Sequence, residues 1–216
     1  MRTAIYGSRP DGQAKIVAEL AMARPDLELV GLLDDFEENR GRSFGGLTVL
    51  GTGSDLAALR EAGVHALLIG FGESLGRADV IARAKEADLE LPNLVHASAV
   101  VYGSASLGRG VQIFPLAHVG AAATLADGVL VNTAASVEHD CVVDTGAVLL
   151  PGARLGGRVR VARDASVGAG AVVFPDVVIG EGAFVGAGAV VRHDVAAHER
   201  VVGVPARPLP DRVERS

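Results

Sequence analysis

Apolar side chains recur at every sixth position through the second half of the chain. Seventeen positions spaced six residues apart, from Val95 to Val191, carry only valine, leucine or isoleucine. The residue four places after each of them is alanine, valine or cysteine. An α-helix repeats about every 3.6 residues and a strand every two, so neither keeps every sixth side chain on one face over this length. The pattern predicts a parallel β-helix built from hexapeptide turns.

A coil of three hexapeptides accounts for this period. Each hexapeptide makes one short strand and one corner, so every sixth side chain lies at the axis and each residue stacks on the one eighteen positions later. Neighbouring coils then hydrogen-bond as parallel strands about 4.8 Å apart. We expect glycines at the second position of several corners to permit the tight turns. These glycines are Gly108, Gly120, Gly156, Gly168, Gly180 and Gly186.

Residues 1–92 instead alternate short apolar runs with helical patterns. We expect strands at residues 3–6, 27–33 and 66–69 and helices at residues 12–23, 55–62 and 74–87. Residues 36–52 are interpreted as a glycine-rich loop, and Ser54 is the expected cap of the second helix. Alternating strands and helices are typical of a parallel sheet whose strand ends hold ligands. The predicted fold class is α/β plus all-β, with a Rossmann-like domain at 1–92 and a β-helix domain with a C-terminal tail at 93–216.

The composition narrows the range of partners. The formal charge is −6 and charged residues make up 21% of the chain, which argues against nucleic acid or an anionic membrane as a partner. Apolar runs stay shorter than a membrane span, and Met1 leads directly into a strand without a signal-peptide pattern, so we expect a cytoplasmic protein. The single cysteine, Cys141, occupies a small-residue position, where a packing role is expected.

The loop from Gly7 to Gly12 joins the first strand to the first helix. Its backbone N–H groups and the helix N-terminus could face a phosphate, and Asp34 or Asp35 could accept a hydrogen bond from a ribose or a base. The spacing G-x-x-x-x-G lacks the lysine of a phosphate-binding P-loop. A simple strand-to-helix turn beside solvated acids is the alternative interpretation.

Stacking assigns each side chain of the predicted prism to a column. His139 lies between Ala121 and Gly157, so its imidazole borders a groove with almost no side chains. A neutral imidazole can act as a general base near neutral pH, and the carboxylate of the next residue, Asp140, can raise its basicity. Asp140 stands in a column whose next member is Arg158. A corner histidine at the surface, without chemistry, is the competing interpretation.

The other histidines raise a second possibility. Hexapeptide prisms can hold zinc between subunits, as in the γ-class carbonic anhydrases, and such a site needs three protein ligands. His118 lies in a different column from His139, and the two have no third partner at short spacing. We therefore expect no metal.

Several motifs together resemble one known family. A Leu-Asp-Asp strand end and an Ile-Gly strand end lie in the first part, and the motifs of the second part are Asn132-Thr133, Glu138-His139-Asp140-Cys141, Pro151-Gly152-Ala153 and Gly203-Val204-Pro205-Ala206-Arg207. With this combination the chain resembles, over nearly its whole length, the PglD/NeuD-type sugar acyltransferases of the hexapeptide-repeat family. The resemblance implies the left-handed form of the β-helix, a homotrimer, and acetyl-CoA in the groove between neighbouring prisms. The implied acceptor is a UDP-linked amino sugar in PglD-like members and sialic acid in NeuD-like members.

The resemblance also implies roles for individual residues. His139 would remove a proton from the acceptor as it attacks the thioester, Asp140 would tune this base, and Asn132 would position the acceptor. The positions implied to lie beside acetyl-CoA are Gly157, Gly168, Ala169, Ala187 and Gly188, with Arg207 near the adenine. The positions implied to hold the nucleotide-sugar are Arg9, Pro10, Asp11, Asp34, Asp35 and Gly70.

Three departures from the family pattern affect these expectations. Val148 stands nine residues after the base, where the family has a second histidine, and Leu150 narrows the wall above Asn132. The first loop reads Pro10-Asp11-Gly12 instead of Gly-His-Gly, and the third strand is followed by Gly70-Phe71-Gly72 instead of Gly-Asp-Asn or Gly-Asn-Asn. Two loops on the acceptor side therefore differ in chemistry from those of the family.

The expected activity is acetyl transfer from acetyl-CoA to the amine of a nucleotide-linked amino sugar, with UDP as the carrier and with direct attack assisted by His139. Two alternatives stay open on the same fold. One is an O-acetyltransferase of the sialic-acid type, and the other is a non-catalytic scaffold whose small domain only binds a nucleotide. A zinc lyase is a third alternative, which bound zinc would reveal.

Overall fold

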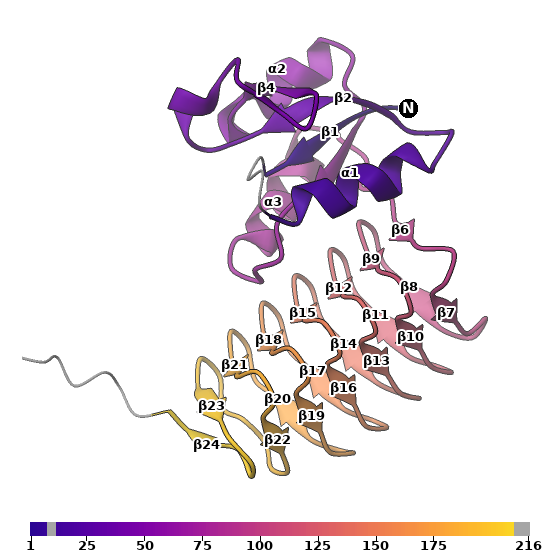
Figure 1. Ribbon diagram of the computed structural model, residues 1–216, viewed down its shortest axis with the longest axis vertical. Helices are drawn as coiled ribbons and strands as arrows, with labels where there is room; N and C mark the ends of the chain where they lie inside the picture. Colours follow the sequence, from indigo (N-terminus) through magenta and orange to yellow (C-terminus); the bar gives the residue numbers. More distant parts are fainter. Residues whose placement is uncertain (8–11, 210–216) are drawn as a thin grey trace, which may run out of the picture.

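The computed structural model describes residues 1–7 and 12–209 and contains a small α/β part beside a long three-sided prism (Figure 1). The N-terminal sheet has the strand order β3-β4-β2-β1-β5. Its strands are β1 (Arg2–Tyr6), β2 (Glu28–Leu33), β3 (Ser43–Phe44), β4 (Leu47–Gly51) and β5 (Ala66–Ile69), and the helices are α1 (Ala14–Met22), α2 (Leu56–Glu61) and α3 (Arg77–Glu86). None of the described helices is long and apolar enough to cross a membrane.

The centre of the N-terminal sheet is parallel, as the alternation of strands and helices predicts. β1 pairs in parallel with β2 and β5, and β2 pairs in parallel with β4. The interpretation of residues 36–52 as a loop is wrong, because this segment contains β4 and its short antiparallel partner β3. Val49 of β4 is 1% exposed and lies opposite Leu32 of β2, so burial of a short apolar run adds a strand to the sheet.

Thr52, and not Ser54, caps the helical segment that contains α2. The backbone N–H of Thr52 donates to Asp55 Oδ2 (2.7 Å), and Thr52 Oγ1 accepts from the backbone N–H of Ser54 (3.3 Å). A 3₁₀ turn at Gly53–Asp55 precedes α2. The expected cap is wrong because this extra turn moves the start of the helical segment toward the N-terminus.

Three parallel sheets form the sides of the prism. The docking sheet, which faces the N-terminal part, consists of β6 (Leu94–Val95), β9 (Gln112–Ile113), β12 (Leu130–Val131), β15 (Val148–Leu149), β18 (Ser166–Val167), β21 (Phe184–Val185), β23 (Arg200–Val202) and the antiparallel β24 (Arg207–Pro208). The second sheet consists of β7 (Val100–Val101), β10 (His118–Val119), β13 (Ser136–Val137), β16 (Arg154–Leu155), β19 (Val172–Val173) and β22 (Val190–Val191). The third sheet consists of β8 (Ser106–Leu107), β11 (Thr124–Leu125), β14 (Val142–Val143), β17 (Arg160–Val161) and β20 (Val178–Ile179). His118 pairs with Ser136 and Leu130 with Val148, which confirms the predicted stacking of residues eighteen apart.

The second residue of each prism strand points to the axis and, from Ile113 to Val191, is at most 1% exposed. Each fully buried aliphatic side chain contributes about 1.5–3 kcal/mol of gross transfer free energy. Val95 is an exception at 43% exposed, because its strand β6 ends the docking sheet and no further coil covers it. The axial row is therefore the core of the prism except in the first coil, where Val101 and Leu107 are only partly buried.

The corner glycines have a different role from the expected one. A Cβ on Gly156 would lie 2.7 Å from the backbone N of Pro175, and one on Gly168 would lie 2.6 Å from the backbone N of Ala187. The left-handed backbone conformation occurs two residues later in the corner, and Arg158 adopts it with a φ of 60°. These glycines thus allow the next coil to approach closely, while the left-handed position itself is occupied by glycine in four of these six corners and by Ala122 or Arg158 in the other two.

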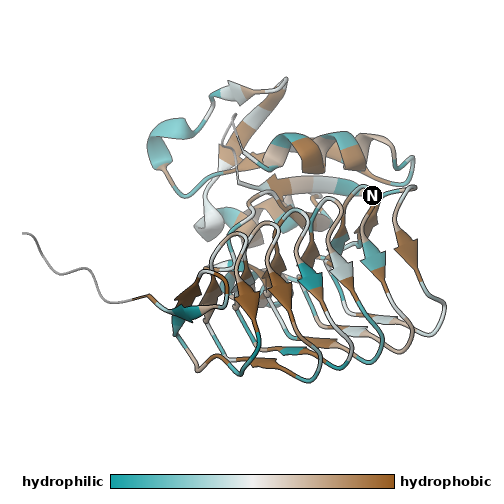
Figure 2. Ribbon diagram, turned by 60° about the horizontal axis from the view of Figure 1, so that its bottom comes forward, coloured by the Kyte–Doolittle hydropathy of each residue, from teal (hydrophilic) through white to brown (hydrophobic). Residues whose placement is uncertain are grey.

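The N-terminal part lies along the docking sheet in both views (Figure 1, Figure 2). Gln112, Leu130 and Val148 point outward from this sheet, yet all three are buried. Leu130 and Val148 belong to one apolar cluster with Ile5 of β1 and Val17 of α1. The two parts of the chain therefore share a continuous apolar core across their contact.

A fully buried arginine adds a polar connection between the two parts. Arg77, the first residue of α3, donates to the backbone oxygens of Gly128 (3.0 Å) and Phe71 (2.6 Å) and to Gln112 Oε1 (3.1 Å). The side chain of Gln112 in turn donates to the backbone oxygen of Ile69 (2.7 Å). Burial lowers the pKa of Arg77 to about 9, which leaves the guanidinium charged near neutral pH. The contact is thus held by matched hydrogen bonds as well as by apolar packing.

Candidate active site

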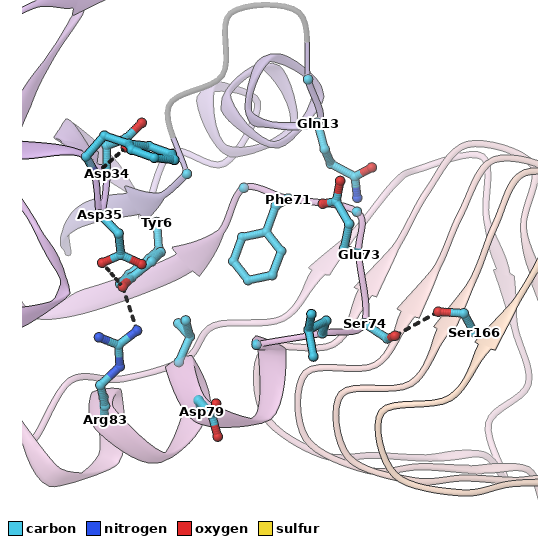
Figure 3. Close-up of a pocket in the computed structure, with 18 of the residues that line it drawn as sticks. Tyr6, Gln13, Asp34, Asp35, Phe71, Glu73, Ser74, Asp79, Arg83 and Ser166 are labelled. Carbon is cyan, nitrogen blue, oxygen red and sulfur yellow. Dashed lines mark hydrogen bonds between the residues drawn. The ribbon is translucent and has the colours of Figure 1, made fainter. Parts of the chain in front are cut away.

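A cavity of about 930 Å³ lies where the carboxyl ends of β1, β2 and β5 meet the docking sheet (Figure 3). Its lining residues at the strand ends are Gly7, Asp34, Asp35 and Gly70, and those on the prism are Leu150, Ser166 and Phe184. Parallel strands end at one edge of a sheet, so the strand order alone brings Asp34, Asp35 and Gly70 together. The hydroxyl groups of Ser74 and Ser166 lie 2.7 Å apart and join the two walls.

One end of the cavity has a fixed polar wall. The hydroxyl of Tyr6 donates to Asp35 Oδ1 (2.6 Å) and accepts from Arg83 Nη2 (2.6 Å), as the dashed lines in Figure 3 show. Burial, and then the hydrogen bond to Asp35, raises the pKa of Tyr6, so the phenol stays protonated and keeps donating. The backbone N–H of Gly53 also donates to Asp35 Oδ1 (3.2 Å). This carboxylate is therefore held in one orientation beside the cavity.

Asp34 and the first loop complete the strand-end side of the cavity. Asp34 is 7% exposed, and its Oδ1 accepts from the backbone N–H of Phe36 (2.9 Å). Arg9, Pro10 and Asp11, which the resemblance places beside a nucleotide-sugar, lie outside the described residues.

Asn132 reaches the cavity only through another side chain. It is 6% exposed, and its Nδ2 lies 3.5 Å from Oε1 of Gln13, which lines the cavity. Within the described part of the chain, Gln13 Nε2 is buried and has no hydrogen-bond partner. An unpaired buried amide can donate to a ligand in the cavity. Gln13 is not among the site residues predicted from the sequence, although it directly follows Gly12 at the start of the first helix.

Val148, at the position where the resembling family has a second histidine, is buried and does not line the cavity. The outward residues of the docking sheet change along the prism from the buried Leu130 and Val148 to Ser166 and Phe184, which line the cavity. Val148 is 0% exposed beneath the N-terminal part, whereas Leu150 on the following corner forms part of the cavity wall. A side chain at position 148 therefore contributes to the core between the two parts of the chain.

His139 and Asp140 lie on a corner between β13 of the second sheet and β14 of the third sheet. His139 Nδ1 is 2.7 Å from Asp140 Oδ2, and half of the imidazole surface is exposed. A carboxylate only accepts, so Nδ1 carries the proton of the neutral ring and Nε2 is left as a proton acceptor. The backbone N–H of Arg158 donates to the His139 oxygen (2.9 Å), and Gly157 lies against the ring as the predicted column requires.

The described chain does not bring His139 and the cavity together. His139 lies on the edge between the second and third sheets, while the cavity opens over the docking sheet. Asn132 lies on the edge between the docking sheet and the second sheet. The predicted site residues thus form two groups on one molecule, separated by the second sheet.

No protein-family model matches the chain, but several solved structures do. The acetyltransferase domain of PglB from Neisseria gonorrhoeae FA1090, in complex with acetyl coenzyme A, is 36% identical, covers 96% of this chain and 98% of its own, and has a TM-score of 0.86. A histidine variant of the GDP-perosamine N-acetyltransferase from Caulobacter crescentus, in complex with CoA and GDP-perosamine, is 33% identical over 98% of both chains, with a TM-score of 0.90. This chain belongs to the hexapeptide-repeat sugar N-acetyltransferases.

A third structure, WeeI from Acinetobacter baumannii AYE, is 26% identical, covers 97% of this chain and 100% of its own, and has a TM-score of 0.84. The resemblance inferred from the sequence motifs is therefore confirmed, together with the left-handed β-helix that follows a small α/β domain. The chain is an acetyl-CoA-dependent sugar N-acetyltransferase.

On the edge of the prism that carries Asn132, the acetyltransferase has a surface of residues with small or no side chains, namely Ala169, Ala187 and Gly188. Ala187 stacks on Ala169 there, since the backbone N–H of Gly188 donates to the Ala169 oxygen (2.8 Å). A Cβ on Gly188 would meet only open space, whereas one on Gly168 would collide with the coil above. Gly188 and the alanines thus fit a surface that an extended cofactor can approach, while coil packing alone accounts for Gly168.

Two other predicted cofactor positions of the acetyltransferase lie elsewhere. Gly157 is covered by the His139 ring, since a Cβ there would lie 2.6 Å from His139 Nε2. Arg207 is exposed on β24 and lines a second cavity of about 320 Å³, together with Arg192 and His193, which directly follow β22. Within residues 1–7 and 12–209 no group of three or more histidine, cysteine or acidic side chains is placed to hold a metal ion.

Proposed function

We propose that this chain transfers an acetyl group from acetyl-CoA to the amine of a nucleotide-linked amino sugar. In this proposal residues 1–92 hold the acceptor and residues 93–216 hold the acyl donor. The observation that carries it is the cavity of about 930 Å³, which joins the strand ends of the N-terminal sheet to the docking sheet. Its size is within the range of pockets that enclose small ligands, about 300–1,000 Å³.

His139 is proposed as the general base. The amine nitrogen attacks the thioester carbonyl carbon, His139 Nε2 takes the amine proton, and the C–S bond breaks to release CoA, whose sulfur takes up a proton. Asp140 supports this role because its hydrogen bond to Nδ1 (2.7 Å) keeps Nε2 free to accept and stabilises the imidazolium that forms. Both substrates meet in one ternary complex, so no covalent enzyme intermediate is needed.

The separation of His139 from the cavity supports a homotrimer with active sites between subunits. Residues with exposed apolar surface lie on the second sheet and its two edges, with Val100 at 54%, Tyr102 at 49% and Leu116 at 68%. An apolar surface of this kind is typical of contacts between subunits. In the assembly, this sheet would carry the His139 edge of one copy toward the cavity of its neighbour. Light scattering of the purified protein tests the trimer, and a monomer at assay concentration would contradict it.

UDP is the carrier expected from the resemblance, whereas the Caulobacter relative binds GDP-perosamine. Asp35 beside Tyr6 offers a fixed acceptor for the N–H groups of a base. Calorimetric titration with UDP and with GDP compares the two carriers directly. If UDP binds at least tenfold more tightly than GDP, the result supports UDP as the carrier. If GDP binds more tightly, GDP replaces UDP as the proposed carrier.

Release of free thiol from acetyl-CoA, in the presence of UDP- and GDP-linked amino sugars, tests the reaction itself. Replacing His139 with alanine should lower kcat by about 10²–10⁴-fold while the oligomer stays intact. Mass spectrometry of the product after mild alkali separates the two transferase outcomes, because an amide survives and an ester is hydrolysed. Tight nucleotide binding without thiol release from any acceptor would contradict the proposed reaction.

A further inference from the structure

The carboxylate that orients His139 has a competing partner nearby. Asp140, Arg158 and Asp176 lie eighteen residues apart on successive coils, and all three adopt the left-handed conformation, with φ values of 58°, 60° and 66°. The backbone N–H of Arg158 donates to the His139 oxygen (2.9 Å), and that of Asp176 donates to the Gly157 oxygen (3.0 Å). The backbone of Arg158 thus lies about one strand spacing, roughly 4.8 Å, from the backbone of an aspartate on either side.

Arg158 pairs with only one of these two carboxylates. Its Nε donates to Asp176 Oδ1 (2.6 Å) and its Nη2 donates to Asp176 Oδ2 (2.9 Å). A two-point pairing fixes the direction of the guanidinium as well as its position. Asp140 is left to His139 Nδ1, at 2.7 Å. Arg158, the side chain that could form an ion pair with Asp140, is therefore held by Asp176 of the next coil.

We propose that Asp176 is a positioning residue for the catalytic pair, because it holds Arg158 away from Asp140 and leaves that carboxylate to orient His139. The inference rests on the proposed role of His139 as the base. If Arg158 turned onto Asp140, the Nδ1–H bond would weaken and the tautomer with hydrogen on Nε2 would gain population. That tautomer cannot accept the amine proton.

The charged groups around His139 determine how a substitution at Asp176 should change the pH dependence of catalysis. Asp140 contacts the ring, Asp176 interacts electrostatically with it from two coils away, and Arg158 lies between the two carboxylates. Glu138 precedes the histidine in the same corner. The hydrogen bond from Arg158 holds the pKa of Asp176 below its usual range, so Asp176 is charged throughout the working pH range of a histidine base.

Asp176→Asn tests the proposal with little risk to the fold, because asparagine tolerates the left-handed conformation. The variant should lower kcat about tenfold, which is part of the contribution of a general base, with KM for the acceptor nearly unchanged. The acid-side limb of the kcat/KM profile should move to lower pH, because the imidazolium has lost its carboxylate partner. Imidazole ¹⁵N NMR should show a larger population of hydrogen on Nε2.

Two rescue variants separate positioning from a general loss of structure. Asp176→Glu keeps the charge and should retain most of the activity. Arg158→Met combined with Asp176→Asn removes the competitor and should restore both kcat and the pH profile. As a matched control, Asp88→Asn breaks another surface arginine pair (Arg60 Nη2 to Asp88 Oδ2, 2.9 Å) at another left-handed position and should change neither.

Unchanged kcat, pH profile and NMR signals in Asp176→Asn would overturn the proposal. A double variant as slow as Asp176→Asn would also overturn it, because Asp176 would then act by a route other than Arg158. His139→Ala separates this failure from failure of the proposed function. If His139→Ala keeps its activity, the base assignment is wrong, whereas an inactive His139→Ala beside a normal Asp176→Asn rejects only the role of Asp176.

Discussion

The imidazole of His139 lies against a residue that has no side chain. A Cβ on Gly157 would lie 2.6 Å from Nε2 and 2.7 Å from Cε1 of the ring. The backbone of Gly157 is outside the left-handed region, so its lack of a side chain provides space for the ring and does not serve the turn. This pair could be predicted from the sequence, because a constant six-residue period determines which residues stack.

Gly157→Ala should displace the His139 ring and lower kcat about tenfold or more, and Gly157→Leu should abolish turnover. The melting temperature should stay within a few degrees of the parent, because the methyl group meets the end of a side chain and not backbone. Thiol release and thermal unfolding measure the two effects. Gly103→Ala is the matched control, since it lies in the same column with open space around it. A fully active Gly157→Ala would contradict the column argument.

Cys141, two residues after the proposed base, packs against the next coil. It is buried, its Sγ donates to the Gly156 oxygen (3.1 Å), and burial raises the pKa of the thiol. A raised pKa leaves little thiolate, so the folded protein should not react with a disulfide reagent at about pH 8. In denaturant one equivalent should react at once. Rapid labelling of the folded protein would contradict the packing role.

The polar wall of the cavity could not be predicted in the same way. Tyr6, Asp35 and Arg83 come from separate segments whose spacing follows no repeat, and their hydrogen bonds form only once the sheet and α3 are packed. Asp34, Asp35 and Gly70 were predictable because strand ends of a parallel sheet meet. Gln13 had only one local signal, its position directly after Gly12 at the start of a helix.

At the scale of elements, the strands that recur with a fixed spacing could be predicted from the sequence, whereas a short strand that occurs once could not. The prism strands recur with identical spacing, so each one supports the assignment of its neighbours. β4 occurs once and is short, and it becomes a strand because Val49 packs against β2. The docking sheet gives a second example. Val148 points outward from the prism, and the reason for an apolar residue there appears only when the N-terminal part packs over it.

Val148→His places the family's second histidine in this chain and should destabilise it without raising kcat. The side chain at this position is 0% exposed in an apolar cluster, and an unpaired buried polar group costs about 1–3 kcal/mol. Chemical denaturation measures the loss. Ser166→His is the matched control, because Ser166 is the next outward residue of the same sheet and lines the cavity. A more active and equally stable Val148→His would show that the position reaches the substrates.

Arg77→Met should loosen the N-terminal domain from the prism. It leaves the oxygens of Gly128 and Phe71 and the Gln112 side chain without their donor, and a buried acceptor left unpaired costs about 1–3 kcal/mol in the free energy of unfolding. Hydrogen exchange should increase at the amides of Leu130 and Val148. Arg60→Met, at an exposed arginine of α2, should cost less than about 1 kcal/mol. Equal stability of the two variants would mean that Arg77 does not hold the domains together.

At the scale of the whole molecule, the proposed base and the proposed acceptor cavity lie apart on one chain. The cavity and its fixed carboxylate lie over the docking sheet, and the proposed base lies across the second sheet. Nucleophile, thioester and base must lie within about 3–3.5 Å of one another for transfer to occur. A closed ring of prisms can satisfy this requirement by presenting the His139 edge of one copy to the cavity of the next.

Subunit mixing tests this arrangement through two inactive variants. His139→Ala removes the base, and Ser166→Trp fills the cavity, so each protein alone should be inactive while circular dichroism and light scattering show a normal assembly. If they are unfolded and refolded together in equal amounts, about one quarter of the sites should combine an intact base from one copy with an intact cavity from another. Activity near one quarter of the parent is therefore expected. A mixture as inactive as its components would place the base and the acceptor in the same chain.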